Sequence, residues 1–314
     1  MQKKIVDSEF DLICIVPREN HGWILEKLAK VVMANYPGKS QLVSSIYRIP
    51  PARVYLFLHY EWLVKSLRHN PILFNAKIFA WYTHPKETKI SEDEFRWVFN
   101  QQAYIISACQ MFAQSLVRQG IAENRVSSVI GAGADSDLFL STPRKSRCIG
   151  LVSAFYPRKN PELLMELVQR MPEYEFLLLG SGWPEYCHFK SLNDLENFTY
   201  IEDSYQNYPS QYRKMNVFLS LSKLEGGPVP LVEAMMANLI PVVSDTGFAR
   251  EIIEHEVNGY LFPVTATAGQ VESLIRRAFD NDIDVHSTAQ HLTWDFYGRQ
   301  MVEKLDDYGG HQKC

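Results

Sequence analysis

Two glutamates with a fixed spacing, Glu225 and Glu233, are the side chains of this chain that most directly suggest chemistry. Glu225 stands in a glycine turn with Gly226 and Gly227, and Glu233 lies within an apolar stretch that predicts a helix. Two prolines follow the turn, and they can occupy only the first turn of that helix, where a missing N–H matters least. An apolar strand precedes the turn, so both carboxylates belong at the carboxyl edge of a parallel sheet, where ligands bind.

A second cluster, Arg158-Lys159-Asn160-Pro161, precedes another predicted helix over 161–170. Asn160 is suited to the N-cap and Pro161 to the first helical position, so two cations stand beside the unsatisfied N–H groups of a helix start. Such a place binds an anion, and Arg and Lys add charge-assisted hydrogen bonds to a phosphate. For this cluster by itself, a solvated basic turn is the alternative.

The overall composition restricts the class of protein. With 314 residues and 46% hydrophobic residues, the chain can build two ordinary α/β domains. Its net charge of -4 argues against a nucleic-acid partner held by bulk charge. Its five cysteines are widely spaced without a Cys-x-x-Cys pair, so neither a disulfide framework nor a metal site is expected. No segment resembles a signal peptide or a membrane span, which favours a cytoplasmic protein.

Predicted strands and helices alternate along the whole chain, which indicates doubly wound parallel sheets. The strands are expected at 11–17, 41–44, 53–59, 77–83, 103–108, 126–130, 148–153, 175–179, 199–201, 217–221 and 240–243. A polar, proline-containing connector at 141–146 suggests a domain boundary near residue 144. The last segment, 291–314, contains a predicted helix that could pack back on the first domain.

The motifs of the second half occur together in a known family. They are Ser222-Lys-Leu-Glu-Gly, Glu233-Ala-Met-Met-Ala, Ile240-Pro-Val-Val-Ser-Asp-Thr-Gly, Arg250-Glu-Ile-Ile and Asn258-Gly-Tyr-Leu-Phe. In this order they resemble the nucleotide-sugar-binding domain of the GT-B glycosyltransferases, specifically the retaining family GT4, also called group 1. The resemblance extends over about residues 148–300, and it is weaker in the first half.

The resemblance implies a fold and an activity. The fold would be two Rossmann-like domains facing a cleft, with 1–143 on the acceptor side and 144–290 binding the nucleotide sugar. The activity would be metal-independent, retaining transfer of a sugar from a nucleotide-diphosphate sugar to a hydroxyl of a saccharide or lipid-linked acceptor. The nucleotide sugar is then a substrate, and no further cofactor is expected.

The resemblance also implies roles for individual residues. Lys159, helped by Arg158, would bind the diphosphate and stabilise the charge of the leaving nucleotide. Glu225 would hold hydroxyls of the transferred sugar, Glu233 would hold the ribose, and His84 would lie near the donor sugar. The remaining donor-binding candidates are Gly22, Ser153, Gly180, Asp203, Gly226 and Gly227.

Departures from the family pattern leave other functions open. Ala154 stands where the family often has an arginine near the diphosphate, and the first domain is short. A catalytically silent protein that binds a sugar nucleotide or a glycan is therefore one alternative. A sugar-nucleotide hydrolase or epimerase is another, although the carboxylates and histidines usual for those enzymes have no clear counterparts.

Three further features carry open interpretations. Peripheral membrane contact could come from Trp23, Trp62, Trp81, Lys65 and Arg68. The aromatic segment 205–212 could stack on a base or sugar, or form a surface loop. The acids at 135–137 and 280–284 resemble metal-binding patterns, but solvated turns explain them better.

Overall fold

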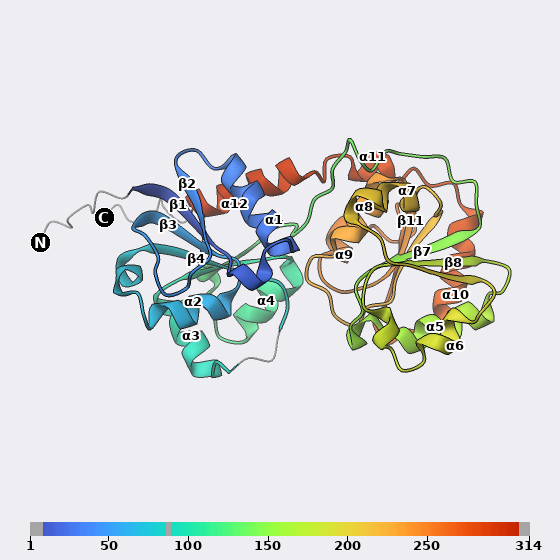
Figure 1. Cartoon of the computed structure of the whole chain (residues 1–314), viewed down its shortest axis with the longest axis horizontal. Helices are drawn as coiled ribbons and strands as arrows, with labels where there is room; N and C mark the ends of the chain where they lie inside the picture. The colour runs from blue at the N-terminus through green and yellow to red at the C-terminus, as the bar shows by residue number, and fades with distance from the viewer. Residues whose placement is uncertain (1–8, 86–88, 308–314) are drawn as a thin grey trace, which may run out of the picture. The chain divides into compact units, whose positions relative to one another are not determined.

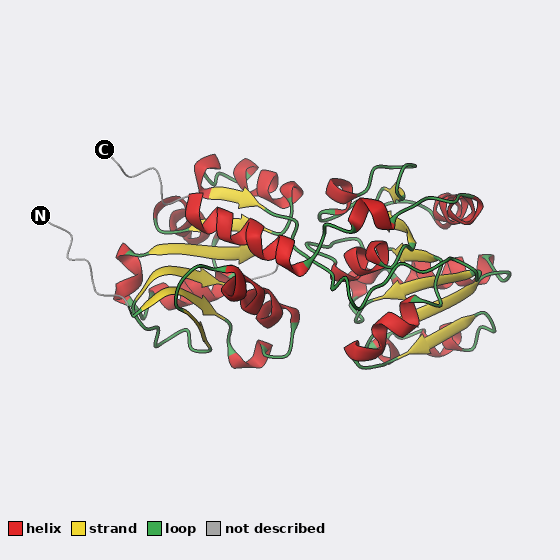
Figure 2. Ribbon diagram, turned by 90° about the horizontal axis from the view of Figure 1, so that it is seen from above, coloured by secondary structure: helices red, strands yellow, loops and turns green. Residues whose placement is uncertain are grey.

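The computed structural model describes residues 9–85 and 89–307, which form two compact units (Figure 1). The first unit contains the chain up to Gly131 together with the segment from Trp294 onward, and the second runs from Ala132 to Thr293. Each unit has its own six-stranded parallel sheet. Figure 2 shows helices on both faces of each sheet, so the predicted doubly wound α/β fold class is confirmed.

The sheet of the first unit has the strand order β2-β1-β3-β4-β5-β6. Its strands are β1 (Phe10–Ile15), β2 (Ser40–Val43), β3 (Ala52–Phe57), β4 (Lys77–Tyr82), β5 (Tyr104–Ser107) and β6 (Val126–Ser128). Its helices are α1 (Ile24–Asn35), α2 (Tyr60–Leu67), α3 (Glu92–Gln101), α4 (Gln110–Arg118) and α12 (Trp294–Asp307). Short 3-10 turns lie at Arg18–Asn20, Pro71–Asn75 and Glu123–Arg125.

Strand β1 and helix α12 both contribute to the core of the first unit. Leu12 and Cys14 of β1 are completely buried, because a strand inside a parallel sheet is covered by helices on both faces. From the far end of the sequence, α12 adds Tyr297, Met301 and Leu305 to the same core. It lies against α1 (Figure 1). The first unit is thus built from two distant parts of the chain.

The sheet of the second unit has the order β12-β11-β10-β7-β8-β9. Its strands are β7 (Cys148–Val152), β8 (Glu175–Leu179), β9 (Phe198–Ile201), β10 (Val217–Ser220), β11 (Ile240–Ser244) and β12 (Tyr260–Phe262). Its helices are α5 (Pro161–Arg170), α6 (Phe189–Asn193), α7 (Tyr208–Tyr212), α8 (Val229–Met236), α9 (Ala249–Ile252), α10 (Ala268–Asp280) and α11 (His286–Ala289). Turns of 3-10 helix lie at Pro157–Lys159, Trp183–Glu185 and Tyr205–Asn207.

The strand order of the second unit defines where a ligand would bind. Strands β7, β8 and β9 follow one another from the middle of the sheet to one edge. Strands β10, β11 and β12 then follow one another from the middle to the other edge. Strands β7 and β10 are neighbours, so the order reverses between them. In open α/β sheets, ligands bind beyond the carboxyl ends of the strands at such a switch point. A ligand would therefore contact the segments that follow Val152 and Ser220.

Helix α8 begins close to the position that the two prolines predict. Pro228 is the residue before its first helical position, and Pro230 lies in its first turn. Beyond its end, Asn238 has a φ of 67°, and this left-handed residue ends the helix. Glu233 consequently lies within the helix, while Glu225 lies in the preceding turn.

The limits of the units differ from the expected ones. The second unit begins at Ala132, ahead of the polar connector near residue 144, because the intervening segment packs within it. Phe139 is 1% exposed, and its ring lies 5.1 Å from that of Tyr212. The C-terminal segment of the first unit begins at Trp294, close to the expected residue 291.

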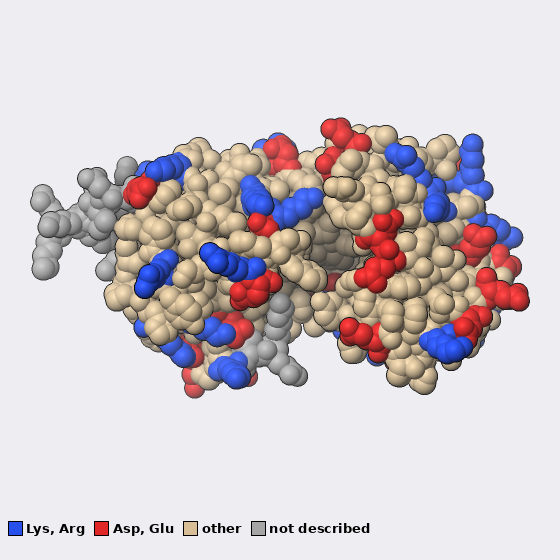
Figure 3. All heavy atoms as spheres, viewed as in Figure 1, with Lys and Arg blue, Asp and Glu red and all other residues tan. Residues whose placement is uncertain are grey.

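Within residues 9–85 and 89–307, none of the helices combines the length and the hydrophobicity that a bilayer span needs. Lysines, arginines and acidic residues are interspersed over the face drawn in Figure 3. That distribution agrees with the small net charge of -4. On this face, the described residues show no broad basic surface of the kind that holds nucleic acid by charge.

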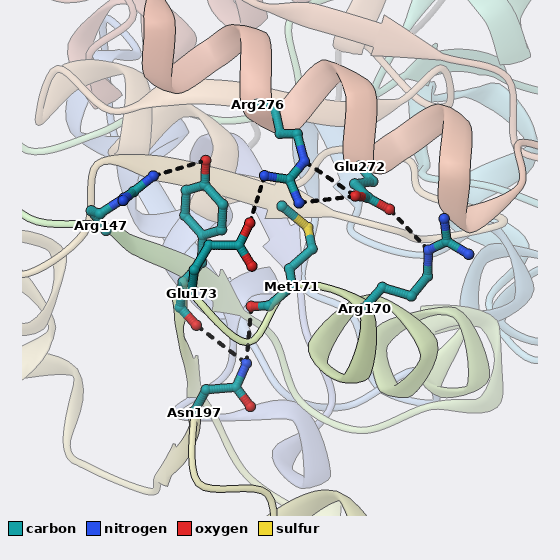
Figure 4. Close-up of polar contacts among 8 residues, drawn as sticks. Arg147, Arg170, Met171, Glu173, Asn197, Glu272 and Arg276 are labelled. Atoms are coloured by element: carbon teal, nitrogen blue, oxygen red, sulfur yellow. Dashed lines mark hydrogen bonds and ion pairs between the residues drawn. The ribbon is translucent and has the colours of Figure 1, made fainter.

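A set of ion pairs ties α5 to α10 at the amino edge of the second sheet (Figure 4). Arg276 of α10 contacts Glu173 at 2.6 Å and Glu272 at 3.0 Å, and Arg170 at the end of α5 contacts Glu272 at 2.9 Å. The side-chain amide of Asn197 donates to backbone carbonyls of the turn that contains Glu173. These contacts lie at the amino ends of the strands, whereas the switch point lies at the carboxyl ends. They therefore stabilise the packing of α5 against α10.

Replacing Arg276 by alanine should lower the melting temperature slightly and leave ligand binding unchanged. The loss should shrink when sodium chloride is raised, because partly exposed ion pairs are screened by salt. Thermal unfolding at low and high salt measures this. Arg299→Ala, which removes a pair with Asp295 inside α12, is the matched control and should cost less. A salt-independent loss for Arg276→Ala would contradict the electrostatic explanation.

Candidate functional site

The basic turn lies beyond the carboxyl end of β7 and leads into α5. Pro157–Lys159 form a 3-10 turn, and α5 begins at Pro161 as predicted. Asn160 joins them with a φ of 59°, in the left-handed region, and its side chain makes no capping hydrogen bond. The predicted side-chain cap is therefore wrong, because a capping side chain reaches the first-turn N–H groups from an extended backbone.

An ion pair between Lys159 Nζ and Glu225 Oε1 joins the two clusters singled out from the sequence. The two side chains are only 15% and 11% exposed. Burial opposes the charge of Glu225, but the Lys159 ammonium, the Ser222 hydroxyl and the Arg158 guanidinium outweigh it and hold the pKa of Glu225 below its ordinary range. An ammonium and a carboxylate therefore meet in a place shielded from water, directly beyond β7 and β10.

Arg158 holds the loop after β7 against the loop after β10. Its carbonyl oxygen accepts a hydrogen bond from the N–H of Lys223 at 2.8 Å, and its Nε donates to the carbonyl of Leu224 at 3.2 Å. The guanidinium also lies 4.4 Å from the centre of the Tyr156 ring. A guanidinium carries five N–H donors, so the others can still serve an anion.

The turn that carries Glu225 is supported from below by the loop after β11. The N–H of Glu225 donates to Thr246 Oγ1 at 3.1 Å. Gly247 has a φ of 64°, and a Cβ placed there would lie only 2.6 Å from the carbonyl oxygen of Gly226. Only glycine allows this approach. Thr246 and Gly247 belong to the motif that begins at Ile240, but the motif does not reveal their contacts, because the residues that they touch are distant in the sequence.

Glu233 projects from α8 into a group of tyrosines. It is 1% exposed, and both of its carboxylate oxygens accept hydrogen bonds. Tyr205 donates to Oε1 at 2.5 Å, and Tyr212 donates to Oε2 at 2.9 Å. Burial and the charge of Glu233 raise the pKa of both phenols, so they remain donors. The aromatic segment 205–212 is thus organised around this carboxylate.

Ser153 and Gly180, two predicted donor-binding residues, lie at the ends of β7 and β8 and contact each other. The carbonyl of Ser153 accepts a hydrogen bond from the indole N–H of Trp183 at 2.8 Å. Gly180 has a φ of 147°, and a Cβ there would lie 2.1 Å from the same carbonyl. Close backbone approach explains the glycine. The expected contacts of both residues with a donor stay predictions.

Asp203, also a donor-binding candidate, organises the turn before α7. Its carboxylate accepts hydrogen bonds from the side chain of Asn207 at 2.7 Å and from the N–H of Ser204 at 2.8 Å. These two bonds lower the pKa of Asp203. Its interactions are those of a residue that shapes the segment carrying Tyr205, and a contact with the donor stays a prediction.

The other candidates are divided between the two units. Gly226 and Gly227 form the turn before α8. Gly22 and His84 belong to the first unit, where they follow β1 and β4 respectively. Gly22 has a φ of 79°, and its N–H donates to Glu26 Oε2 at 2.6 Å, so it is engaged in starting α1. His84 is half-buried. Their proximity to a donor stays a prediction.

The tryptophans considered for membrane contact differ in exposure. Trp23 is 61% exposed, whereas Trp81 is 1% exposed and belongs to the core of the first unit. Trp62 is half-buried and packs against the same core. Trp81 therefore cannot face lipid, since its position on β4 points it into the interior.

The acidic segments 135–137 and 280–284, which resemble metal-binding patterns, make local contacts. Asp135 accepts a hydrogen bond from the N–H of Asp137 at 3.1 Å, and Asp282 pairs with Arg144 at 2.9 Å. Within residues 9–85 and 89–307, no group of three or more His, Cys, Asp or Glu is arranged to hold a metal ion.

The family comparison matches the part of the chain that holds this site. The sequence model of the family described as glycosyl transferases group 1 matches residues 139–292, which include Lys159, Glu225 and Glu233. The second unit belongs to the group 1 glycosyltransferases. The resemblance inferred from the motifs is confirmed.

Curated relatives from Escherichia coli are similar to part of this chain. One, the UDP-Gal:alpha-D-GlcNAc-diphosphoundecaprenol alpha-1,3-galactosyltransferase, is 22% identical over 190 residues, 55% of this chain and 47% of the relative. Another, the O-antigen biosynthesis glycosyltransferase WbnH, is 27% identical over 149 residues, 45% of this chain and 42% of the relative. The chain matches less than half the length of these relatives.

Solved structures share the fold over nearly the whole chain. Anabaena HepE in complex with UDP-glucose superposes with a TM-score of 0.76 at 14% identity, covering 95% of this chain and 100% of that one. The lipopolysaccharide outer core galactosyltransferase WaaB in its apo form gives 0.74 at 13% identity, covering 95% and 99%. At these identities the likeness establishes the GT-B fold.

The ionised state of Glu225 should make the Lys159 pair sensitive to acid. At neutral pH, Glu225→Gln should be less stable than the wild type by about 3 kcal/mol, because it leaves a buried ammonium without its counter-charge. A lowered pKa in the folded state contributes stability above the ordinary glutamate value of about 4.3, and this contribution is lost as the pH falls through the lowered pKa.

Chemical unfolding of wild type and Glu225→Gln between pH 7 and pH 3 measures this change. The difference between the two proteins should be constant near neutrality and should shrink below about pH 4.3. A difference that grows in acid would mean that the pKa of Glu225 is raised in the folded protein.

Two neighbouring glycines allow a matched test of the β7–β8 edge. Gly180→Ala should lower stability by about 2 kcal/mol or more, because the new Cβ meets the Ser153 carbonyl in addition to the unfavourable φ. Gly182→Ala, with a φ of 77° and its nearest neighbour at 3.7 Å, should cost about 1 kcal/mol from the backbone alone. Denaturant unfolding of both variants decides this. Equal losses would show that the close approach is unimportant.

Proposed function

We propose that this protein is a retaining glycosyltransferase that moves a sugar from a nucleoside-diphosphate sugar to a hydroxyl of a saccharide or lipid-linked acceptor, without a metal ion. The observation that carries the proposal is the shielded Lys159–Glu225 pair beyond β7 and β10, at the switch point of a group 1 domain. Glu233, on the helix that follows Glu225, supplies a second carboxylate.

The cations of the basic turn act on the diphosphate. Lys159 binds a phosphate oxygen through donors that its contact with Glu225 leaves available, since an ammonium has three N–H groups. Arg158, fixed by its bond to Leu224, adds a guanidinium beside it. Cations held in place before the reaction stabilise the negative charge that develops on the departing nucleotide. These cations thereby neutralise the charge of the leaving diphosphate, as a metal ion does in other transferases.

The two glutamates orient the donor. A carboxylate accepts hydrogen bonds from neighbouring hydroxyls, and the lowered pKa of Glu225 keeps it in that form. We assign Glu225 to hydroxyls of the transferred sugar and Glu233 to the ribose. Neither is placed as a nucleophile or as a general acid, which distinguishes this arrangement from the paired carboxylates of glycoside hydrolysis.

The transfer step is a substitution with retention. The bond between the anomeric carbon and the diphosphate oxygen breaks, and a bond from the acceptor oxygen forms on the same face of a short-lived oxocarbenium-like ion pair. The acceptor proton passes to the phosphate oxygen of the departing nucleotide. Lys159 and Arg158 lower the barrier by stabilising that leaving group.

Uridine is the base to test first. HepE was solved with UDP-glucose, and the name of one Escherichia coli relative specifies UDP-galactose and a diphosphoundecaprenol-linked acceptor. These names support a uridine-diphosphate sugar as donor and a lipid-linked saccharide as acceptor for this chain as well.

Nucleotide release and binding test the proposal. A calorimetric screen of UDP, GDP, ADP and dTDP should identify one bound nucleotide, and acceptor-dependent release of that nucleotide from its sugar should continue in EDTA. Lys159→Ala and Glu225→Ala should each reduce turnover about 100-fold or more. Arg276→Ala, at the opposite edge of the sheet, is the control and should retain full turnover.

The outcomes separate the candidate functions. Release of nucleotide with transfer of sugar to the acceptor supports the transferase, and full turnover by Lys159→Ala and Glu225→Ala would overturn the residue assignment. Binding without turnover would identify a silent binding protein, the alternative that Ala154 favours. Loss of donor without an acceptor product would identify a hydrolase.

A further inference from the structure

The carboxylate of Glu233 is closed to solvent by tyrosines. The residue is 1% exposed, and each of its oxygens already accepts a phenolic hydrogen bond. A ribose can reach this carboxylate only if a neighbouring side chain moves. The assignment of Glu233 to the ribose therefore requires a movable group above it.

Tyr205 and Tyr212 differ in their freedom to move. Tyr212 is completely buried at the end of α7, and its ring lies 5.1 Å from that of Phe139. Tyr205 lies in a short 3-10 turn, and its ring also contacts Phe139, at 6.3 Å, but the residue is 41% exposed. An exposed ring can change rotamer without opening the core, whereas a buried ring cannot. Tyr205 is therefore the side chain that can leave.

The backbone beneath Tyr205 is held firmly, so its movement is confined to the side chain. Asp203 anchors the turn through Ser204 and Asn207, and the hydroxyl of Ser210 donates to the carbonyl of Asn207 at 2.7 Å. These bonds fix the position of the Tyr205 Cα. The phenol thus has a defined place on Glu233 when it is bound there.

We infer that Tyr205 competes with the ribose hydroxyls of a nucleotide for the carboxylate of Glu233. This inference rests on the proposed function, because it takes the ligand of Glu233 to be a ribonucleotide. The phenol offers one O–H donor, while a ribose offers two from adjacent carbons, so the exchange replaces one hydrogen bond to Glu233 by two. Tyr212 keeps its bond throughout.

The competition has a consequence for turnover. A nucleotide whose ribose hydroxyls bind Glu233 must break the bond between Tyr205 and Glu233, which weakens the affinity for the donor and for the nucleotide product alike. Product release limits the rate of many enzymes, and a side chain that reclaims the carboxylate favours release. Tyr205 is in this sense a residue that sets nucleotide affinity, without contact with the reacting atoms.

Calorimetric binding of UDP and of 2′,3′-dideoxy-UDP to wild type and Tyr205→Phe tests the inference. Tyr205→Phe keeps the ring and removes the competing hydroxyl, so UDP should bind about tenfold more tightly, as expected for loss of one competing bond to a charged group. The dideoxy nucleotide lacks the hydroxyls that use Glu233, so its affinity should stay the same. The two effects together form a double-mutant cycle between Tyr205 and the ribose hydroxyls.

Tyr212→Phe is the matched control. It removes the other phenolic bond to Glu233, but that bond is present with and without nucleotide, so UDP should not bind more tightly. Its melting temperature should fall, because a buried carboxylate loses a donor. This pattern separates competition from a general effect of removing a tyrosine hydroxyl.

The outcomes distinguish this inference from the proposed function. Unchanged or weaker UDP binding by Tyr205→Phe, while the wild type binds UDP, overturns the competition alone. Equal tightening for UDP and its dideoxy analogue also overturns it, since the ribose hydroxyls would not be involved. Failure of the wild type to bind any nucleoside diphosphate overturns the proposed function and this inference together.

Discussion

The contact between Lys159 and Glu225 is the interaction on which the site depends. It joins the loop after β7 to the loop after β10. These two strands are neighbours in the sheet, and the strand order switches between them. Each charge of a pair shielded from water is stable only while its partner stays beside it. The ion pair therefore holds the two loops together. The bonds of Arg158 to the second loop reinforce it. The switch in strand order and the buried ion pair therefore point to the same place in the second unit, beyond the carboxyl ends of β7 and β10.

Sequence patterns predicted the elements well where the signal was local. The apolar run before the Glu225 turn and the prolines at the start of α8 follow from short-range rules, and the structure has a strand and a helix start there. The side-chain cap expected at Asn160 is wrong, because the backbone there is left-handed and the side chain makes no capping hydrogen bond. The limits of the units were also missed, since burial of Phe139 cannot be inferred from a polar connector.

The charged residues of the candidate site can be singled out from the sequence, whereas the residues that support them cannot. Lys159 and Glu225 were found because ionisable residues beside glycines and helix starts carry a chemical signal. Thr246 and Gly247 contact the same turn through backbone atoms, and the tyrosines around Glu233 act through their hydroxyls. Neither set of contacts leaves a repeating pattern in the sequence from which it could be predicted. Contacts between segments distant in the chain are what the structure adds.

Helix α12 has a consequence for how the protein is made. The second unit is one continuous stretch, Ala132 to Thr293, and it contains every strand of its own sheet. The first unit needs Tyr297 and Met301 from a helix translated after all of that stretch. Domains fold as units during synthesis. The first unit emerges first from the ribosome, but its hydrophobic core stays incomplete until α12 has been synthesised. The second unit can therefore finish folding before the first.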